Sequence, residues 1–157
     1  MRQKDRTQIF AHLAKSNHQL SEIEGQEALI TLEGPHDYIS PSWYSGPGVP
    51  TWNYQAVHIY GKCKVFSEPH RLKKVVDSLT DKYESRFEKP WQADYKAAML
   101  DAIVGVEILI NQVQCKYKLS QNRTTKDQEL VIQQLKNVGS TKLAEAMEKN
   151  FILTKKS

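Results

Sequence analysis

Residues 34–61 read GPHDYISPSWYSGPGVPTWNYQAVHIYG, and this stretch decides how the rest of the chain is interpreted. It holds four Tyr, two Trp and two His between repeated Gly and Pro residues. Large aromatic side chains are costly to leave in water, and Gly and Pro hold the backbone in turns. The stretch therefore predicts a shaped, aromatic-lined loop between two strands, and it is the first place to look for a planar ligand.

Alternating or continuous apolar residues predict four strands around this loop. They cover residues 7–14, 28–33, 54–66 and 103–110, and the last is strongly apolar and therefore central. The polar segment 15–25 fits either a short helix or a loop. Gly61 lies in the middle of the third strand, where glycine indicates a bulge or a close backbone approach.

Helical spacing predicts the remaining elements. A helix begins after the expected N-cap Ser67 and runs to about residue 85, and a shorter one covers residues 93–102. The apolar stripe expected to face the core in the first of these helices consists of Leu72, Val75, Val76, Leu79 and Tyr83.

Two more helices are expected at the C-terminal end. Thr125 and Gln128 fit a capping box for a helix that directs Leu130, Val131 and Leu135 toward the core. Ser140 is the expected cap of a last helix, with Leu143 and Met147 on its apolar face.

Strands followed by helices, without regular alternation, predict an α+β fold with an antiparallel sheet. At 157 residues the chain is expected to form a single domain, residues 1–157. Within it we expect strands and the aromatic loop at 1–66, helices at 67–102, a central strand at 103–113 and a basic helical part at 114–157.

Composition and charge narrow the class of protein. No apolar run is long enough for a membrane span and no secretion signal is recognisable, so we expect a cytoplasmic protein without membrane contact. The two cysteines, Cys63 and Cys115, fit a reducing compartment. Residues 115–157 carry nine Lys or Arg against four Asp or Glu, which fits either a solvated helical face or a surface for DNA.

Common catalytic and metal-binding motifs are absent from the sequence, so no catalytic and no metal-ligating residue is predicted. Near the end of the first strand, His12, Lys15 and Asn17 offer a cation and donors for a phosphate, or simply form a polar loop. Ser40 and Ser42 offer hydroxyls beside the rings of Trp43 and Tyr44. That mixture suits a flavin or similar cofactor, and it suits equally an aromatic plug that closes a barrel end or a subunit interface.

Two further groups complete the candidate site. Trp52, Asn53 and Tyr54 form either a second aromatic wall or a contact with a partner subunit. A polar cluster before the capping box can hold an anion at a helix start or serve only capping and solvation; it contains Lys118, Ser120, Gln121, Asn122 and Arg123.

In this order, the motifs HLAKSN, GPHDYISPSWY, VPTWNYQAVHIYG, IVGVEI and YKLSQNR resemble the PaiB-like family of FMN-binding negative transcriptional regulators. The resemblance implies a split β-barrel related to pyridoxamine-phosphate oxidases and flavin reductases, with C-terminal helices. It also implies a homodimer that holds FMN in a cleft at the subunit interface. The family carries an N-terminal segment with the first barrel strands, whereas only residues 1–8 precede the first motif here. We therefore expect a barrel lacking those strands.

The resemblance assigns the candidate residues by motif. His12, Lys15 and Asn17 match its HxAxxN element, where Lys15 replaces a common Arg and loses the bidentate geometry of the guanidinium. The SxSWY, TWNY and KLSQNR elements match the other cofactor-binding residues: Ser40, Ser42, Trp43, Tyr44, Trp52, Asn53, Tyr54, Lys118, Ser120, Gln121, Asn122 and Arg123.

Three functions compete at this point. The first is an FMN-binding transcriptional repressor, with DNA contacted by the basic C-terminal third. The second is an FMN-dependent oxidoreductase or a haem-handling split-barrel enzyme, because the fold alone does not decide the chemistry. The third is a cofactor-free, degenerate dimeric interaction module, which the missing strands favour.

Overall fold

The computed structural model describes residues 7–155 and contains a four-stranded sheet with four α-helices. Its strands are β1 (Gln8–Ala14), β2 (Glu27–Ile39), β3 (Thr51–Phe66) and β4 (Ile103–Lys118). Its helices are α1 (Pro69–Glu84), α2 (Ala97–Asp101), α3 (Thr125–Asn137) and α4 (Thr141–Lys155). Short 3-10 helices lie at His18–Ser21 and Pro41–Trp43.

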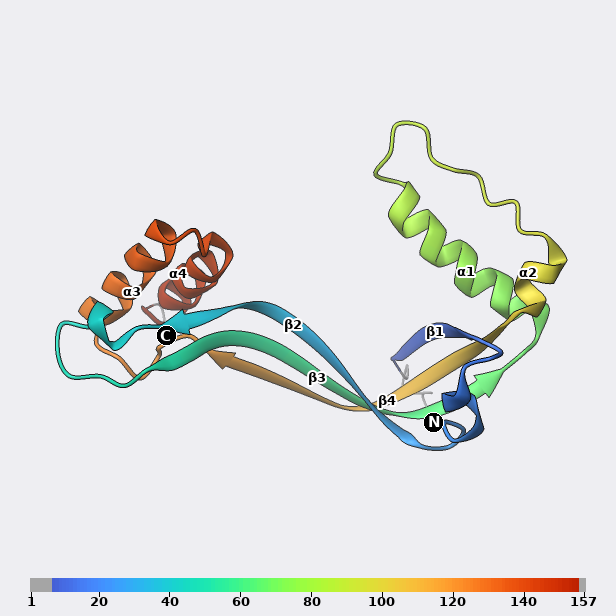
Figure 1. The fold of residues 1–157 in the computed structure, drawn as a ribbon, viewed down its shortest axis with the longest axis horizontal. Coiled ribbons are helices and arrows are strands. Elements are labelled where there is room, and N and C mark those ends of the chain that lie inside the picture. Colours follow the sequence, from blue (N-terminus) through green and yellow to red (C-terminus); the bar gives the residue numbers. More distant parts are fainter. Residues whose placement is uncertain (1–6, 156–157) are drawn as a thin grey trace. The chain divides into compact units, whose positions relative to one another are not determined.

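The strands follow the order β1-β4-β3-β2 in the sheet, and β3 runs antiparallel to both of its neighbours (Figure 1). β1 pairs antiparallel with β4 in a register that places Gln8 opposite Leu109 and Ala14 opposite Ile103. The predicted antiparallel sheet followed by C-terminal helices is confirmed.

Gly61 marks the close approach between β3 and β4 that its position in mid-strand predicts. A Cβ on Gly61 would lie 2.6 Å from Ile108 Cγ2 and 2.7 Å from the carbonyl oxygen of Leu109. Any larger residue would therefore push the two strands apart.

The chain divides into two compact units. The first contains residues 1–30 and 59–113, and the second contains residues 31–58 and 114–157. In the first unit the buried core is built on β3 and β4 around Cys63, Val106 and Ile108. Partly buried side chains pack against it: Ile9, Leu13, Ile23, Ala28 and Ile30.

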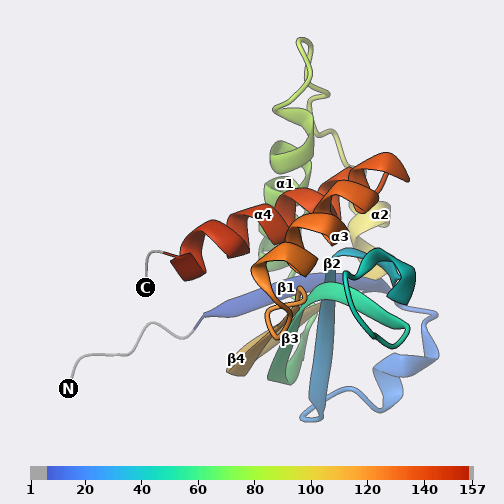
Figure 2. The same ribbon diagram turned by 90° about the vertical axis from the view of Figure 1, so that its left-hand side faces the viewer.

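In the second unit the core lies between the ends of the strands and the pair α3 and α4, which lie side by side (Figures 1 and 2). Gly139 joins the two helices with φ of 85°, and the amide of Ser140 donates to the carbonyl of Leu135 at 2.8 Å. This is the left-handed helix end for which glycine is favoured. The buried side chains are Ile39, Tyr44, Leu119, Val131, Ile132, Leu135, Leu143, Ala144 and Met147.

Several local expectations differ from the structure. The aromatic loop is limited to residues 40–50, because β2 continues through Pro35 to Ile39. Leu79 and Tyr83 are half-exposed at 45% and 49%, so the apolar stripe of α1 extends beyond the core that covers Leu72. Leu130 on α3 is likewise exposed.

The N-caps of two helices also differ by one residue from the predicted positions. Glu68, not Ser67, is the N-cap of α1. On α3, Oγ1 of Thr124, not of Thr125, accepts the hydrogen bond from the amide of Asp127 at 3.1 Å. Thr124 has extended backbone angles, which an N-cap residue requires.

Candidate functional site

The turn between β2 and β3 carries the SxSWY residues. Ser40 caps the short helix Pro41–Trp43 by accepting from the amide of Ser42, and the two hydroxyl oxygens lie 2.7 Å apart. The two hydroxyls that the sequence suggested for a cofactor thus bond to each other and fix the turn.

The two rings after this turn pack inward. Trp43 packs against the core of the second unit, and Tyr44 is buried. The guanidinium carbon of Arg123 lies 4.1 Å from the centre of the Tyr44 ring, a cation–π contact. A Cβ on Gly48 would collide with the same ring. The SxSWY and KLSQNR motifs therefore meet at Tyr44.

Asp127 ties the turn to the start of α3. Its Oδ1 accepts hydrogen bonds from the amide and the hydroxyl of Ser45, both at 2.7 Å. These two bonds, together with the hydrogen bond from Thr124 and the nearby charge of Arg123, lower the pKa of Asp127 below its ordinary value of 3.8. The anion is thereby held at the helix N-terminus, where the helix dipole favours negative charge.

Asn53 of the TWNY motif is buried in the second unit. Its Nδ2 donates to Ser120 Oγ at 2.9 Å and to the sulfur of Met147 at 3.4 Å, while its Oδ1 is buried without a partner among the described residues. Ser120 adopts a φ of 62°, in the left-handed region that few residues other than glycine adopt. Gln121 stabilises this turn by accepting from the amide of Leu119 at 2.7 Å.

Trp52 and Tyr54 flank Asn53 on β3 and point to the opposite face, because side chains alternate along a strand. They are 53% and 36% exposed. The Trp52 ring centre lies 6.4 Å from that of His36 and 6.2 Å from that of Tyr38, both on β2. These rings form an aromatic wall on the surface of the second unit.

The aromatic wall borders a hollow of about 430 Å³, which we call the Trp52 hollow. Lys116 brings a positive charge to it and Glu33 a negative one. On β4, Lys118 donates a hydrogen bond to the hydroxyl of Thr51. The Trp52 hollow is lined by Glu33, His36, Trp52, Tyr54, Gln55, Ala56, His58 and Lys116.

Asn122, in the KLSQNR turn of the second unit, is exposed. The other three predicted residues, which form the HxAxxN element, lie in the first unit. Asn17 caps the short helix His18–Ser21, since its Oδ1 accepts from the amide of Gln19 at 2.9 Å. The amide of Lys15 donates to the carbonyl of Ala102 at 2.9 Å, and its side chain is exposed. His12 lies on β1 opposite Gly105 and lines a groove beside α1.

Sequence reasoning placed the SxSWY, TWNY and KLSQNR motifs in one candidate site, and in the structure these motifs are in contact through Asn53 with Ser120 and Tyr44 with Arg123. It misses His36, Tyr38 and Lys116, which lie around Trp52. The signal for the first two was the alternation of residues 36 and 38 on one face, which becomes visible once β2 is extended to Ile39.

Residues 1–112 match the family described as Putative FMN-binding domain. The chain is 40% identical over 153 residues to Protease synthase and sporulation protein PAI 2 of Bacillus subtilis, a match that covers 92% of this chain and 73% of that one. The protein belongs to this FMN-binding domain family, as the resemblance to PaiB-like proteins implied.

Two solved structures share the fold at low identity. The FAD and haem binding protein from Mycobacterium smegmatis has a TM-score of 0.59 and 13% identity, and the flavocytochrome Anf3 from Azotobacter vinelandii has 0.50 and 17%. The matches cover 78% and 80% of this chain, which spans 58% and 56% of those chains. The fold is thus α+β, with an antiparallel sheet of the split-barrel type and C-terminal helices.

The family supports FMN as the cofactor, and the side chains around Trp52 fit such a group. A flavin needs a flat apolar contact for its ring and a cation for its phosphate. Trp52 and Tyr54 offer exposed ring faces, and Lys116 offers the cation. Tyr44, Asn53 and Ser120 are buried and shape the surrounding backbone instead.

Within residues 7–155, no helix combines the length and the apolar character that crossing a membrane demands. Over the same residues, no three His, Cys, Asp or Glu side chains gather as a metal site would need.

Proposed function

We propose that this protein is an FMN-binding transcriptional regulator of the PaiB-like type, and that its flavin ring packs on Trp52 and Tyr54. The observation that carries the proposal is the exposure of these two rings on one hollow, in a chain of the FMN-binding domain family. When bound, FMN would supply redox chemistry at its ring.

Different residues of the chain would contact the ring and the phosphate of FMN, and others would support them. The aromatic wall stacks on the ring, and Lys116 attracts the phosphate. The SxSWY turn, Asn53 and the KLSQNR turn hold β3 and β4 in place behind this surface. Trp43 belongs to this supporting group, because it packs on the core and not on the Trp52 hollow.

FMN titration of the purified protein, followed by quenching of flavin fluorescence, tests the proposal. We expect saturable binding that Trp52→Ala weakens about tenfold or more, as loss of a stacked ring does. Trp91→Ala is the matched control, since Trp91 lies in the other unit and is similarly exposed at 52%. If the Trp52→Ala protein bound FMN with the same affinity as the wild type, the Trp52 hollow would be ruled out as the flavin site.

The hollow is open to solvent, so a second wall is needed to enclose a flavin. We infer that a second copy of the chain supplies it, which gives a homodimer with the cofactor at the interface. Sedimentation velocity with and without FMN checks this. A protein that stays monomeric while FMN is bound would contradict the dimeric site.

DNA binding is the regulatory half of the proposal. It rests on the basic region 115–157 and on the pair α3 and α4, joined by residues 138–140. Fluorescence anisotropy with duplex DNA should show an affinity that falls steeply with salt. A protein that binds FMN and oxidises NAD(P)H rapidly without binding DNA would instead be an oxidoreductase. A folded protein that binds neither ligand would be an interaction module.

A further inference from the structure

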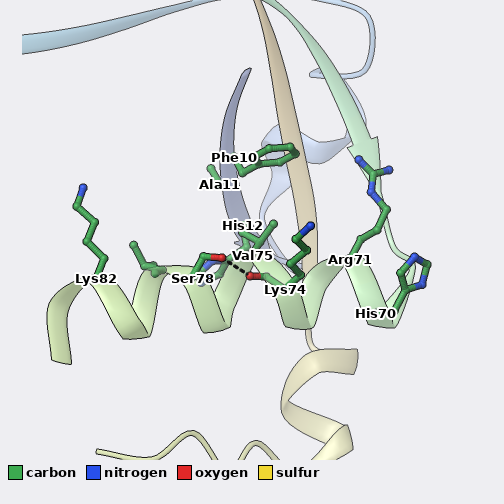
Figure 3. A pocket seen from close by; sticks show the side chains of 10 residues that line it. Phe10, Ala11, His12, His70, Arg71, Lys74, Val75, Ser78 and Lys82 are labelled. Atoms are coloured by element: carbon green, nitrogen blue, oxygen red, sulfur yellow. Dashed lines mark hydrogen bonds between the residues drawn. The ribbon is translucent and has the colours of Figure 1, made fainter. Parts of the chain in front are cut away.

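A second hollow, of about 560 Å³, lies between β1 and α1 in the first unit, and we call it the β1–α1 groove (Figure 3). Of the predicted cofactor-binding residues, His12 alone lines it. The full lining is Phe10, Ala11, His12, His70, Arg71, Lys74, Val75, Ser78, Leu79 and Lys82.

The groove has apolar walls that the fold leaves in water. Phe10 on β1 and Leu79 on α1 are each 45% exposed, and Val75, one turn before Leu79 on the helix, also lines the groove. Such side chains are costly to expose, and the volume falls within the range of small-molecule sites. The groove is therefore suited to the apolar body of a ligand.

The charged side chains of the groove are all basic. Among the described residues no Asp or Glu lines the groove, and the acidic residues of α1, which are Asp77, Asp81 and Glu84, lie outside its lining. Arg71 is already bonded to Glu107 at 2.9 Å and stacks on Phe66. Lys74 has no ion pair within residues 7–155, so its ammonium group is available to a ligand.

We propose that the β1–α1 groove binds a small organic anion, a carboxylate or phosphate monoester attached to an apolar body. The anion lies beside Lys74, and the body lies against Phe10 and Leu79. The groove combines basic groups with apolar walls. A site for inorganic phosphate would need only the basic groups, because such an anion has no apolar part to bury. The proposal does not depend on FMN in the Trp52 hollow, which belongs to the other unit.

Displacement of a fluorescent probe tests the chemistry of the ligand. Anilinonaphthalene sulfonate, itself an aromatic anion, is bound to the purified full chain and then displaced with two naphthalene competitors. We expect 2-naphthoate to displace the probe and 2-naphthylmethylammonium, with the same apolar body and the opposite charge, to leave it bound. Equal displacement by both would show that charge plays no part and would overturn the proposal.

Two neighbouring lysines give the matched variants. Lys74→Gln should weaken naphthoate binding about three- to tenfold. Lys73→Gln should leave it unchanged, because Lys73 does not line the groove and pairs with Asp77 at 2.7 Å. Leu79→Ser should also weaken binding, and the half-exposed position makes unfolding of that variant unexpected. Equal effects of the two lysine variants would contradict the site.

Two further ligands separate this site from the proposed flavin site. Saturating FMN should leave naphthoate binding unchanged, and Trp52→Ala should do the same. Displacement of the probe by FMN, with FMN binding that is sensitive to Lys74→Gln, would assign the groove to the flavin. Displacement by duplex DNA would assign it to nucleic acid. Either result would overturn the proposal that the β1–α1 groove binds a small organic anion.

Discussion

Asn53 on β3 and Ser120 after β4 are 67 positions apart in the sequence, and a buried hydrogen bond of 2.9 Å joins Asn53 Nδ2 to Ser120 Oγ. Ser120 is also the residue whose backbone adopts a left-handed conformation. The bond therefore fixes an unfavourable turn at the point where the chain leaves the sheet for α3.

Asn53→Ala should lower the free energy of unfolding by about 1–3 kcal/mol, because it leaves a buried hydroxyl without its partner. Urea unfolding measures the change. Asn111→Ala is the control, since Asn111 is exposed and its Nδ2 donates to the exposed Glu27 at 2.8 Å, so its loss should stay within about 0.5 kcal/mol. Similar losses in both proteins would show that the buried bond adds nothing special.

Asp127 should make the stability of the second unit depend on acid pH. Its folded pKa lies below the unfolded value, so the stabilisation is present above about pH 4 and is lost as the pH falls through the folded pKa. Asp127→Asn should therefore be less stable than the wild type at pH 7, with the difference shrinking below pH 4. Thermal melting across pH 2–7 tests this, with the exposed Glu129→Gln as control. A gap of constant size would refute the linkage.

Gly61→Ala should destabilise the sheet by about 1–3 kcal/mol, since the added methyl would overlap Ile108 and the backbone of Leu109. Gly46→Ala provides the comparison, because nothing lies within 4 Å of a Cβ there. That substitution should change stability by less than about 1 kcal/mol. Denaturant midpoints of the two variants decide the matter, and equal midpoints would count against the close approach of β3 and β4.

Leu72→Ala and Leu79→Ala make the same chemical change in one helix at different depths. Leu72 is 2% exposed, so its truncation should cost about 2–5 kcal/mol. Leu79 is 45% exposed, and its truncation should cost less than about 1 kcal/mol. Calorimetric melting compares them, and a larger cost at Leu79 would mean that the C-terminal half of α1, and not its first turn, packs into the core.

Most of the sheet could be predicted from the sequence, because buried strands leave a strong apolar pattern. The continuation of β2 through Gly34 and Pro35 could not. These residues are typical of turns, yet Gly34 lies against β3, where a Cβ would come within 3.0 Å of Gln55 Cβ. Pairing with the neighbouring strand overrides the local preference for a turn.

Periodicity alone also did not determine how far the core extends along α1. Leu79 and Tyr83 share the stripe of Leu72, but a helix pattern specifies a face and not what covers it. The β1–α1 groove was not predicted for the same reason, since it requires Phe10 and Leu79, distant in sequence, to line one hollow. In the TWNY motif, the sequence predicts that Trp52 and Asn53 point to opposite faces of a strand. It does not predict that Asn53 is the buried one of the two.

Asn53 and Cys63 both belong to β3, and both are buried, each in the core of a different unit. They stand an even number of positions apart, so they share one face of the strand. Slippage of β3 by a single residue would place Tyr54 and Lys64 in those two cores at once. Burial of Asn53 and of Cys63 therefore each disfavours a shifted register, one near either end of β3. A misaligned β3 would lose the packing of both cores at once.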